Sequence, residues 1–424
     1  MPLPRRDFIF STAALGAAAM APAALARGAR AREAQTLGIG LIGCGGRGTG
    51  AAADALSASP QAQLVAMADL VPDRLEGSLG NLRGEEEIAE RIVVGDNARY
   101  VGFDAYKQLL ERNDIDVVIL ATPPGFRPIH FEAAVDAGKH VFMEKPVAVD
   151  PTGVRKVMAA AEKAKRTNRC VVAGTQRRHE RSYLEAMKRV HDGAIGEIVS
   201  ARCYWNQGGL WVHQRRPEYS DMEWQCRNWL YFPWLSGDHI CEQHIHNLDV
   251  VNWAMGGPPV RAMGVGGRQA RTGPEYGSIY DHFAIQFDYA NGASCTSMCR
   301  QIDGCPPRVE EVIVGTEGTL TTRPGYAKIT GRTPWEFKGE NPNPYQQEHA
   351  DLAAAIASGT PVNEGQRVAE STLTAVMGRL AAYTGQVITF DEALASQLDL
   401  APPAYVFGPL PTPAVAIPGK TKMV

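Results

Sequence analysis

The sequence lacks the features that would assign it at once to several classes of protein. Its 43 Lys and Arg residues nearly balance 46 Asp and Glu, a formal net charge of −3, which predicts neither a nucleic-acid partner nor an anionic membrane partner. Its eight cysteines include no Cys-x-x-Cys pair, and the chain contains no internal repeat. Beyond residue 26 no segment is long and apolar enough to cross a bilayer. What remains is a globular chain whose 424 residues suffice for two domains with cores of their own.

The N-terminus has the pattern of a twin-arginine export signal. Two arginines at positions 5 and 6 precede an apolar run at 10–21, and Ala-Leu-Ala at 24–26 offers a cleavage site. We expect residues 1–34 to be this signal and its linker, and the mature protein to be periplasmic, with an uncleaved anchor as the alternative. Proteins exported by this route fold first, so we expect mostly buried thiols, with a late disulfide left open.

A glycine-rich turn organises the rest of the chain. In TLGIGLIGCGGRGTG, an apolar strand leads into G-x-G-x-x-G and a small-residue helix follows, which is the order that a dinucleotide pyrophosphate requires. Gly43 permits the tight turn, Gly45 lets the backbone approach the phosphates, and Gly48 lets the helix pack on the strand. Arg47 lies in the same turn and is assigned to the cofactor as well. The alternative is a structural turn without a ligand.

An acidic residue follows the next expected strand, 64–68. Asp69 lies 21 residues past Gly48, where a carboxylate accepts both ribose hydroxyls of NAD and repels the 2′-phosphate of NADP. The cofactor is therefore expected to be NAD, with NADP less favoured.

Hydrophobic periodicity divides the chain in two. Strands and helices alternate from 35 to 175, which predicts an α/β Rossmann domain with a parallel sheet. From 176 to 400 the sequence predicts an α+β domain whose sheet is mainly antiparallel, with an Asn291-Gly292 hairpin. The proline-rich tail, 401–424, is expected to lie over the surface or to pair with another subunit. The main elements expected are strands at 37–42, 92–94, 116–121, 140–143, 170–173, 198–205, 260–265, 280–289, 293–302, 310–315 and 318–322, and helices at 72–91 (interrupted near 80–84), 104–112, 130–137, 151–165, 242–255, 349–358 and 364–384.

Lys145 is the first candidate catalytic residue. It follows the strand at 140–143, whose carboxyl end faces the cofactor crevice, and Pro146 fixes the backbone after it. An ammonium group there can hydrogen-bond a substrate hydroxyl and stabilise developing alkoxide charge. A surface lysine in a loop is the alternative.

The sequence resembles the Gfo/Idh/MocA oxidoreductase family. The resemblance depends on GCGGRG at 43–48, TPPGFRPIHFEAAVDAGKHVFMEKP at 122–146 and DHICEQHIHNLDVVNW at 238–253, and it covers essentially the whole mature chain. It implies a Rossmann domain followed by an open-faced, mainly antiparallel sheet domain through which the protein forms a homo-oligomer. It also implies oxidation or reduction of carbohydrate hydroxyl and carbonyl groups with a nicotinamide cofactor.

The resemblance implies roles for individual residues. Lys145 matches the lysine that contacts substrate, and Glu144 lies beside the nicotinamide. The loop along the nicotinamide ribose is matched by Thr122, Pro123 and Pro124.

The acid–base pair of the family is an Asp and a His four residues apart on one helix, and here Glu242 and His246 fill these positions. Residues at i and i+4 share a helix face, so the carboxylate would orient the imidazole that takes the hydroxyl proton. This sequence departs from the family pattern at two positions: Glu242 stands where the family has Asp, and His244 stands where a small residue is common. A histidine bonded inside the domain interface is the alternative for His246. A metal site including His239 is not predicted, because helical i and i+2 histidines point about 200° apart; an irregular helix start would weaken this objection.

Aromatic and polar residues after the Rossmann part are candidates for substrate contact. Trp205 can stack on a sugar ring while Asn206 and Gln207 donate directional hydrogen bonds. Arg177 follows the last parallel strand and could reach the substrate, although a surface salt bridge is equally compatible. The tryptophans at 205–234 are expected to line or cover the pocket, or else to pack a long loop or subunit contact.

Together these observations predict an exported NAD(P)-dependent oxidoreductase that acts on a sugar, glycoside or polyol hydroxyl. A tightly held cofactor is expected, because the periplasm has no nucleotide pool. The first alternative is a redox-assisted glycosidase or epimerase on the same scaffold. The second is a sugar-binding Rossmann protein without catalysis.

Overall fold

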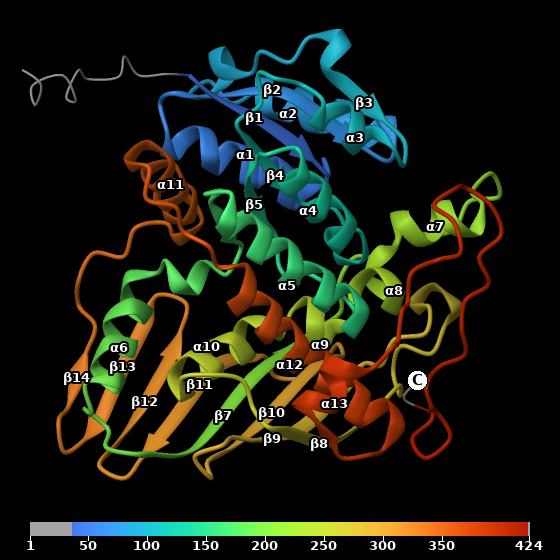
Figure 1. The fold of residues 1–424 in the computed structure, drawn as a ribbon. Coiled ribbons are helices and arrows are strands. Elements are labelled where there is room, and N and C mark those ends of the chain that lie inside the picture. The colour runs from blue at the N-terminus through green and yellow to red at the C-terminus, as the bar shows by residue number, and fades with distance from the viewer. Residues whose placement is uncertain (1–35, 423–424) are drawn as a thin grey trace, which may run out of the picture. The chain divides into compact units, whose positions relative to one another are not determined.

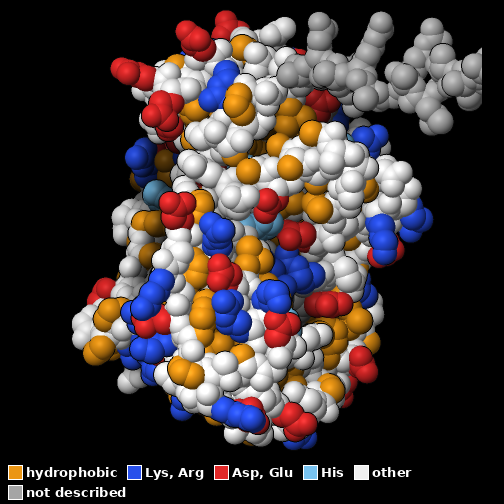
Figure 2. All heavy atoms as spheres, turned by 90° about the vertical axis from the view of Figure 1, so that its left-hand side faces the viewer, with side chains coloured by type: hydrophobic (Ala, Val, Ile, Leu, Met, Phe, Trp, Pro, Cys, Tyr) orange, Lys and Arg blue, Asp and Glu red, His pale blue; other side chains and the backbone are white. Residues whose placement is uncertain are grey.

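The computed structural model describes residues 36–422, and the expected export signal at 1–34 lies outside them. Within the described chain, no helix combines the length and the apolar character needed to cross a membrane. Basic and acidic side chains are interspersed on the face that Figure 2 shows, in agreement with the nearly balanced charge of the sequence.

The first sheet has six parallel strands in the order β3-β2-β1-β4-β5-β6. The strand order reverses between β1 and β4, where a doubly wound sheet binds its ligand. The four residues of β4 are all buried, because helices cover both faces of such a sheet. Its strands are Leu37–Ile42 (β1), Ala62–Asp69 (β2), Arg99–Val101 (β3), Val117–Leu120 (β4), His140–Met143 (β5) and Val171–Ala173 (β6), and its helices are Gly46–Ala58 (α1), Pro72–Arg83 (α2), Ala105–Leu110 (α3), Arg127–Asp136 (α4) and Pro151–Arg166 (α5).

The second sheet has nine strands in the order β14-β13-β12-β11-β7-β10-β9-β8-β15. Every pair is antiparallel except β7 with β10, so the sheet is mainly antiparallel as expected. The predicted hairpin joins β9 to β10, with Gly292 at φ +85. The strands are Ile198–Gln207 (β7), Arg261–Gly267 (β8), His282–Asp288 (β9), Ser294–Gln301 (β10), Arg308–Gly315 (β11), Gly318–Arg323 (β12), Tyr326–Gly331 (β13), Trp335–Glu336 (β14) and Ile388–Thr389 (β15).

Helices cover one face of this second sheet (Figure 1). Burial alternates along β10, as it does when one face is packed and the other is solvated. Helix α12 contacts α5 as well as β8 and β9, and therefore joins the two layers. The helices of this part are Arg181–His191 (α6), Asp221–Arg227 (α7), Pro233–Ser236 (α8), His239–Glu242 (α9), Ile245–Met255 (α10), Pro344–Ser358 (α11), Gly365–Thr384 (α12) and Phe390–Ala395 (α13).

The proline-rich tail lies over the chain's own surface beside α7 and α8 (Figure 1). The amide of Met222 donates to the carbonyl of Gly408 (3.1 Å), and the Gln225 side chain donates to the carbonyl of Leu410 (2.6 Å). All eight cysteines are free and seven of them are buried, which confirms the expectation of mostly buried thiols.

Two local predictions in the Rossmann part differ from the structure. The strand expected at 92–94 is reduced to a single bridge between Leu64 and Ile92, and β3 at Arg99–Val101 takes the edge position instead. Helix α2 ends at Arg83, where the amide of Gly84 bonds back to the carbonyl of Gly80 (3.1 Å), and only a short 3₁₀ turn at Ala89–Arg91 follows the interruption.

Candidate functional site

The glycine turn after β1 leaves an open helix N-terminus. No side chain caps α1 and no acidic residue occupies its first turn, so its N–H groups and partial positive charge are available to an anion. Gly43 has φ +98, and a Cβ at Gly48 would lie 1.9 Å from the carbonyl oxygen of Gly43, so both glycines are required by the fold. A Cβ at Gly45 would meet nothing within 4 Å, which leaves room for a phosphate.

A cavity of about 810 Å³ lies above this turn. Its volume is in the range of ligand and cofactor sites. Six of the residues predicted to bind the cofactor line it, namely Gly43, Gly45, Arg47, Asp69, Thr122 and Pro123, whereas Gly48 and Pro124 pack beneath or beside it. The glycine turn, the uncapped helix and the cavity together fit a dinucleotide.

Backbone amides hold the Asp69 carboxylate at the edge of the cavity. It accepts from the N–H of Cys44 (2.7 Å) in the glycine turn and of Val71 (3.0 Å). Burial raises the pKa of Asp69, and these two hydrogen bonds oppose the shift. The carboxylate thus orients the turn and lies where a ribose would be recognised.

Arg47 connects the cavity to a cluster of carboxylates. Its Nε donates to Glu144, and its other nitrogens lie 3.4 Å from Glu348 and 3.6 Å from Asp54. Burial alone would lower the pKa of Arg47, but the three carboxylates raise it. Arg47 therefore links the glycine turn to Glu144, the residue expected beside the nicotinamide.

A buried arginine that the sequence reasoning missed joins two loops at the carboxyl edge of the sheet. The Arg127 Nε donates to the carbonyl of Glu144 (2.9 Å), and one terminal nitrogen donates to the carbonyl of Thr122 (2.7 Å). Burial lowers the pKa of Arg127 to about 10. The only signal in the sequence was its place in the TPPGFRP segment.

Lys145 reaches from the Rossmann sheet to the helices of the second sheet. Its ammonium group donates to the main-chain carbonyl of Glu242. Burial lowers the pKa of Lys145, while the carboxylates of Glu242 and Glu144 act in the opposite direction. The structure thus brings the predicted lysine and the predicted acid–base segment together.

The prediction of one continuous helix over 242–255 is wrong. Helix α9 ends at Glu242 and α10 begins at Ile245, with His244 as its N-cap. The chain enters α9 through Gly237 and Asp238, both with positive φ, and the His244 ring bonds to Ser297 (2.7 Å) in β10. His244 therefore anchors the helix break to the sheet instead of facing a ligand.

The two residues of the predicted carboxylate–imidazole pair lie on either side of this break. The buried Oε2 of Glu242 and the buried Nδ1 of His246 each lack a hydrogen-bond partner among residues 36–422. Burial raises the pKa of Glu242, with Lys145 opposing. Burial lowers the pKa of His246 far below its ordinary value, and the charge of Lys145 lowers it further. Burial and the nearby ammonium group thus both favour the neutral form of the His246 ring.

Trp205 lies against His246, with ring centroids 5.7 Å apart and planes 24° apart. Its Nε1 donates to the Gln207 side chain (2.5 Å), whose own Nε2 is buried without a partner in the described chain.

Asn206 lies on the opposite face of β7 from Trp205, because successive side chains of a strand face opposite sides. Asn206 shares the far face of the sheet with its register partners Arg300 and Arg308.

Arg177 forms a salt bridge, the alternative that the sequence left open, but inside the protein and not at its surface. It is buried and forms an ion pair with Glu311 of β11, while its guanidinium lies 5.6 Å from the Trp205 ring. Its charge is already neutralised inside the protein, so it acts as a support beneath Trp205 and not as a group open to substrate.

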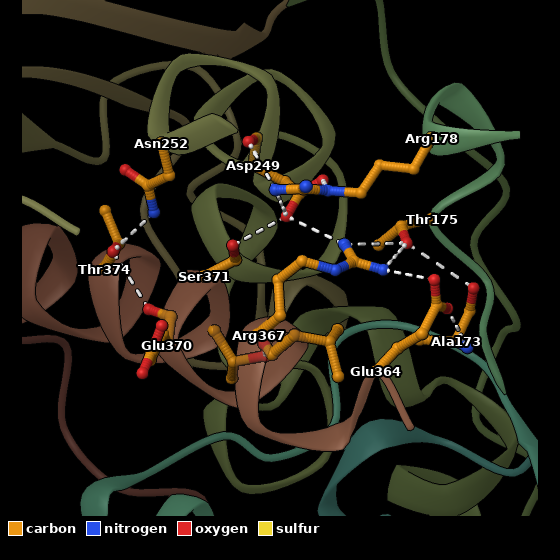
Figure 3. Close-up of polar contacts among 12 residues, drawn as sticks. Ala173, Thr175, Arg178, Asp249, Asn252, Glu364, Arg367, Glu370, Ser371 and Thr374 are labelled. Atoms are coloured by element: carbon orange, nitrogen blue, oxygen red, sulfur yellow. Dashed lines mark hydrogen bonds and ion pairs between the residues drawn. The ribbon is translucent and has the colours of Figure 1, made fainter. Parts of the chain in front are cut away.

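A polar network fixes the helix that carries His246 (Figure 3). Asp249 of α10 accepts from Arg178 (2.7 Å), which follows β6, and from Ser371 (2.7 Å) of α12. Burial would raise the pKa of Asp249, but Arg178 and Arg367 outweigh it and lower the pKa. The network ties α10 to the edge of the Rossmann sheet.

Among the described residues, no group of three or more His, Cys, Asp or Glu side chains could hold a metal ion. The neighbouring imidazoles form hydrogen bonds with different residues: His239 with Asp238 (3.1 Å), and His244 with Ser297.

Two family models match the chain. Residues 37–174 match the model for the oxidoreductase family with an NAD-binding Rossmann fold, and residues 183–321 match the GFO/IDH/MocA C-terminal domain.

The curated relatives are similar over part of their length. The 2,7-anhydro-N-acetylneuraminate hydratase of Escherichia coli is 28% identical over 52% of this chain and 55% of its own. The inositol 2-dehydrogenase/D-chiro-inositol 3-dehydrogenase of Halalkalibacterium halodurans is 26% identical over 40% and 42%. A glycosyl hydrolase family 109 protein of Streptomyces coelicolor is 31% identical over 38% and 31%. The chain spans about half or less of the length of these relatives.

Solved structures show the same fold. A levoglucosan dehydrogenase in complex with NADH and levoglucosan has a TM-score of 0.66 at 20% identity, covering 84% of this chain and all of that one. The aldose-aldose oxidoreductase of Caulobacter crescentus, complexed with glycerol, has a TM-score of 0.65 at 20% identity, with the same coverage.

Proposed function

Because the chain belongs to the Gfo/Idh/MocA oxidoreductase family, we propose that it transfers hydride between a nicotinamide cofactor and a carbinol carbon of a sugar, glycoside or polyol. The observation that carries the proposal is the meeting of Lys145 with the segment of Glu242 and His246, next to the Glu144–Arg47 contact that leads to the dinucleotide cavity. An ammonium group, a neutral imidazole and a cofactor site are the parts that this reaction needs.

The nicotinamide, when bound, supplies the hydride acceptor. Lys145 donates a hydrogen bond to the hydroxyl oxygen of the substrate and stabilises the negative charge that develops there. His246 accepts the hydroxyl proton through its buried Nδ1, which has no other partner in the described chain. Its lowered pKa keeps the ring unprotonated before the reaction but also makes it a weak base, so the charge that Lys145 places on the developing alkoxide has to drive the transfer. The C–H bond breaks with its electron pair, and the carbonyl forms as the proton leaves. Trp205 holds the imidazole ring by stacking on it.

The test is a panel of monosaccharides, disaccharides and polyols with NAD⁺ and NADP⁺, read by the absorbance of the reduced nicotinamide. We expect Lys145→Ala and His246→Gln each to reduce kcat/KM by about 10²–10⁴-fold. Unchanged turnover in both variants would refute the assignment. Asp69 at the cavity favours NAD, so Asp69→Ala should narrow the gap between the Kd values of the two cofactors.

Glu242 favours a second candidate function, a redox-assisted glycosidase or epimerase. A buried carboxyl group with a raised pKa and a free oxygen can protonate a leaving group after transient oxidation. The similarity to a hydratase and to a family 109 glycosyl hydrolase points the same way. Release of the aglycone from a chromogenic glycoside without net NADH, lost in Glu242→Gln, would establish this activity.

Export, tight cofactor retention and assembly complete the proposal. Replacing both arginines at 5 and 6 by lysine should leave the protein in the cytoplasm, as cell fractionation would show. Three apolar side chains are exposed on β8 and β10 of the second sheet, Met263, Val265 and Met298, which supports a homo-oligomer formed through the open face of that sheet. Light scattering of the purified protein, with Val265→Glu as the disrupting variant, tests the assembly.

A further inference from the structure

The outer side of the dinucleotide cavity is formed by a segment that precedes α8 in the second part of the chain. This outer wall consists of Trp211, His213, Cys226, Arg227 and Trp229. The sequence reasoning placed the tryptophans of this region over the substrate pocket, but these two line the cofactor cavity. The facing wall comes from the Rossmann sheet and includes Asp69, Leu70, Arg74, Phe103 and Phe126.

Buried side chains hold the outer wall in shape from behind. The Tyr231 hydroxyl donates to the carbonyl of Trp211 (2.8 Å). The Asn228 side chain accepts from the N–H of His213 (2.9 Å), and the Trp224 indole donates to the carbonyl of His213 (3.1 Å). Tyr231 and Asn228 are fully buried, so the positions of the wall's backbone are fixed by the core beneath it.

A bidentate ion pair fastens the outer wall to the Rossmann sheet. The two terminal nitrogens of Arg227 lie 2.9 and 3.0 Å from the two carboxylate oxygens of Asp73, in the first turn of α2. The neighbouring Arg74 donates to the carbonyl of Arg227 (3.0 Å). Asp73 and Arg74 lie four and five residues after Asp69, the residue expected to bind the ribose. The fastening is therefore at the adenosine end of the cavity.

The C-terminal tail braces both walls from outside. The Phe407 ring packs edge-on against Phe103 (centroids 5.1 Å apart), which belongs to the Rossmann wall. One residue later, the carbonyl of Gly408 accepts from the amide of Met222, next to the outer wall.

We infer that the outer wall binds the adenosine half of the dinucleotide, with Trp211 and Trp229 as aromatic surfaces for the base, and that the Arg227–Asp73 pair keeps this wall closed. An adenine beyond the ribose site meets aromatic rings, on which every nucleobase stacks favourably. To leave, the dinucleotide has to part the wall from α2, so its dissociation is slow. This inference uses the dinucleotide binding of the proposed function and is independent of the sugar chemistry.

The test measures the release of cofactor without any substrate. The full-length protein is loaded with NADH, mixed with excess NAD⁺, and the loss of NADH fluorescence enhancement gives the dissociation rate. We expect Trp211→Ala, Arg227→Met and Asp73→Asn each to raise this rate tenfold or more. Arg227→Lys, which keeps the charge but loses the bidentate geometry, should give an intermediate rate. Arg261→Met is the matched control, because it breaks an exposed ion pair with Asp288 (2.6 Å) far along the second sheet.

Salt supplies a second readout. The Asp73 carboxylate is 61% exposed, so added salt screens the pair and should speed release from the wild type but not from Asp73→Asn. Circular dichroism and Tm show whether the variants fold as the wild type does. Folded variants that still release NADH at the wild-type rate would overturn this inference and leave the proposed function standing. Slow release that the variants accelerate, in a protein that oxidises no sugar, would uphold the inference and refute the proposed function. A wild type that binds no nicotinamide dinucleotide would overturn both.

Discussion

Replacing Arg177 by Met separates a structural role from a substrate-binding role. Arg177 pairs with Glu311, which is fully buried and also accepts from the Asn247 side chain (2.6 Å) and the Thr322 hydroxyl (2.8 Å). Removing one partner of a buried ion pair leaves the other charge unpaired in a low dielectric, at a cost of about 3–5 kcal/mol. We therefore expect the free energy of unfolding to fall by about this amount, with kcat/KM of the folded fraction changed far less.

The pH dependence of this loss has a defined sign. Burial raises the pKa of Glu311 above its ordinary 4.5, and Arg177 opposes the shift. Without Arg177 the folded carboxyl binds its proton still more tightly than in the wild type. The loss should therefore be small at acid pH, where the carboxyl is protonated in both proteins, and grow as pH rises above the raised pKa of the wild-type group. Urea denaturation followed by tryptophan fluorescence at several pH values measures it. The double variant Arg177→Met/Glu311→Leu removes the unpaired charge but also the acceptor of Asn247 and Thr322, so it should recover only part of the lost stability.

A rise in KM without loss of stability would refute this reasoning and restore Arg177 as a substrate contact. Arg308→Met is a suitable control, since it removes an exposed arginine on the same strand as Glu311.

Three further predictions follow from the same contacts. The fall of kcat/KM at acid pH should occur well below pH 6.5, because the pKa of His246 is lowered. This fall should be absent in His246→Gln. A fall at the ordinary histidine pKa would contradict the burial argument. Burial would lower the pKa of His179, but Asp351 and Glu364 outweigh it and raise the pKa from 6.5 to about 9. The contribution of His179 to stability is therefore full below pH 6.5 and lost as pH rises through about 9, and Tm measured across this range should fall less in His179→Gln. Gly48→Ala should prevent folding because its Cβ overlaps the backbone, whereas Gly45→Ala should fold and bind NADH more weakly; circular dichroism and fluorescence titration separate the two.

The parts of the fold that were predictable depend on local signals. The glycine turn, the parallel strands before it and after it, and the Asn-Gly hairpin are written in short stretches of sequence, and the structure has them. The meeting of Lys145 with the Glu242 segment was predicted only through the family resemblance.

The errors concern properties that distant residues decide. The helix break after Glu242 lies at His244, whose ring bonds to Ser297, fifty-three residues later. The faces of β7 that carry Trp205 and Asn206 depend on the pairing of this strand with β10 and β11. Glu311, the partner of Arg177, lies 134 residues away in the sequence, and no pattern near Arg177 predicts this pairing.

The placement of Phe407 and Gly408 has a consequence for biosynthesis. These residues leave the ribosome after both sides of the cavity have been made, and domains fold in the order in which they are synthesised. A nascent chain therefore passes through a stage at which the nucleotide crevice exists and its brace does not. On the proposed function, we expect the dinucleotide to enter more readily at that stage than after residues 407 and 408 have docked.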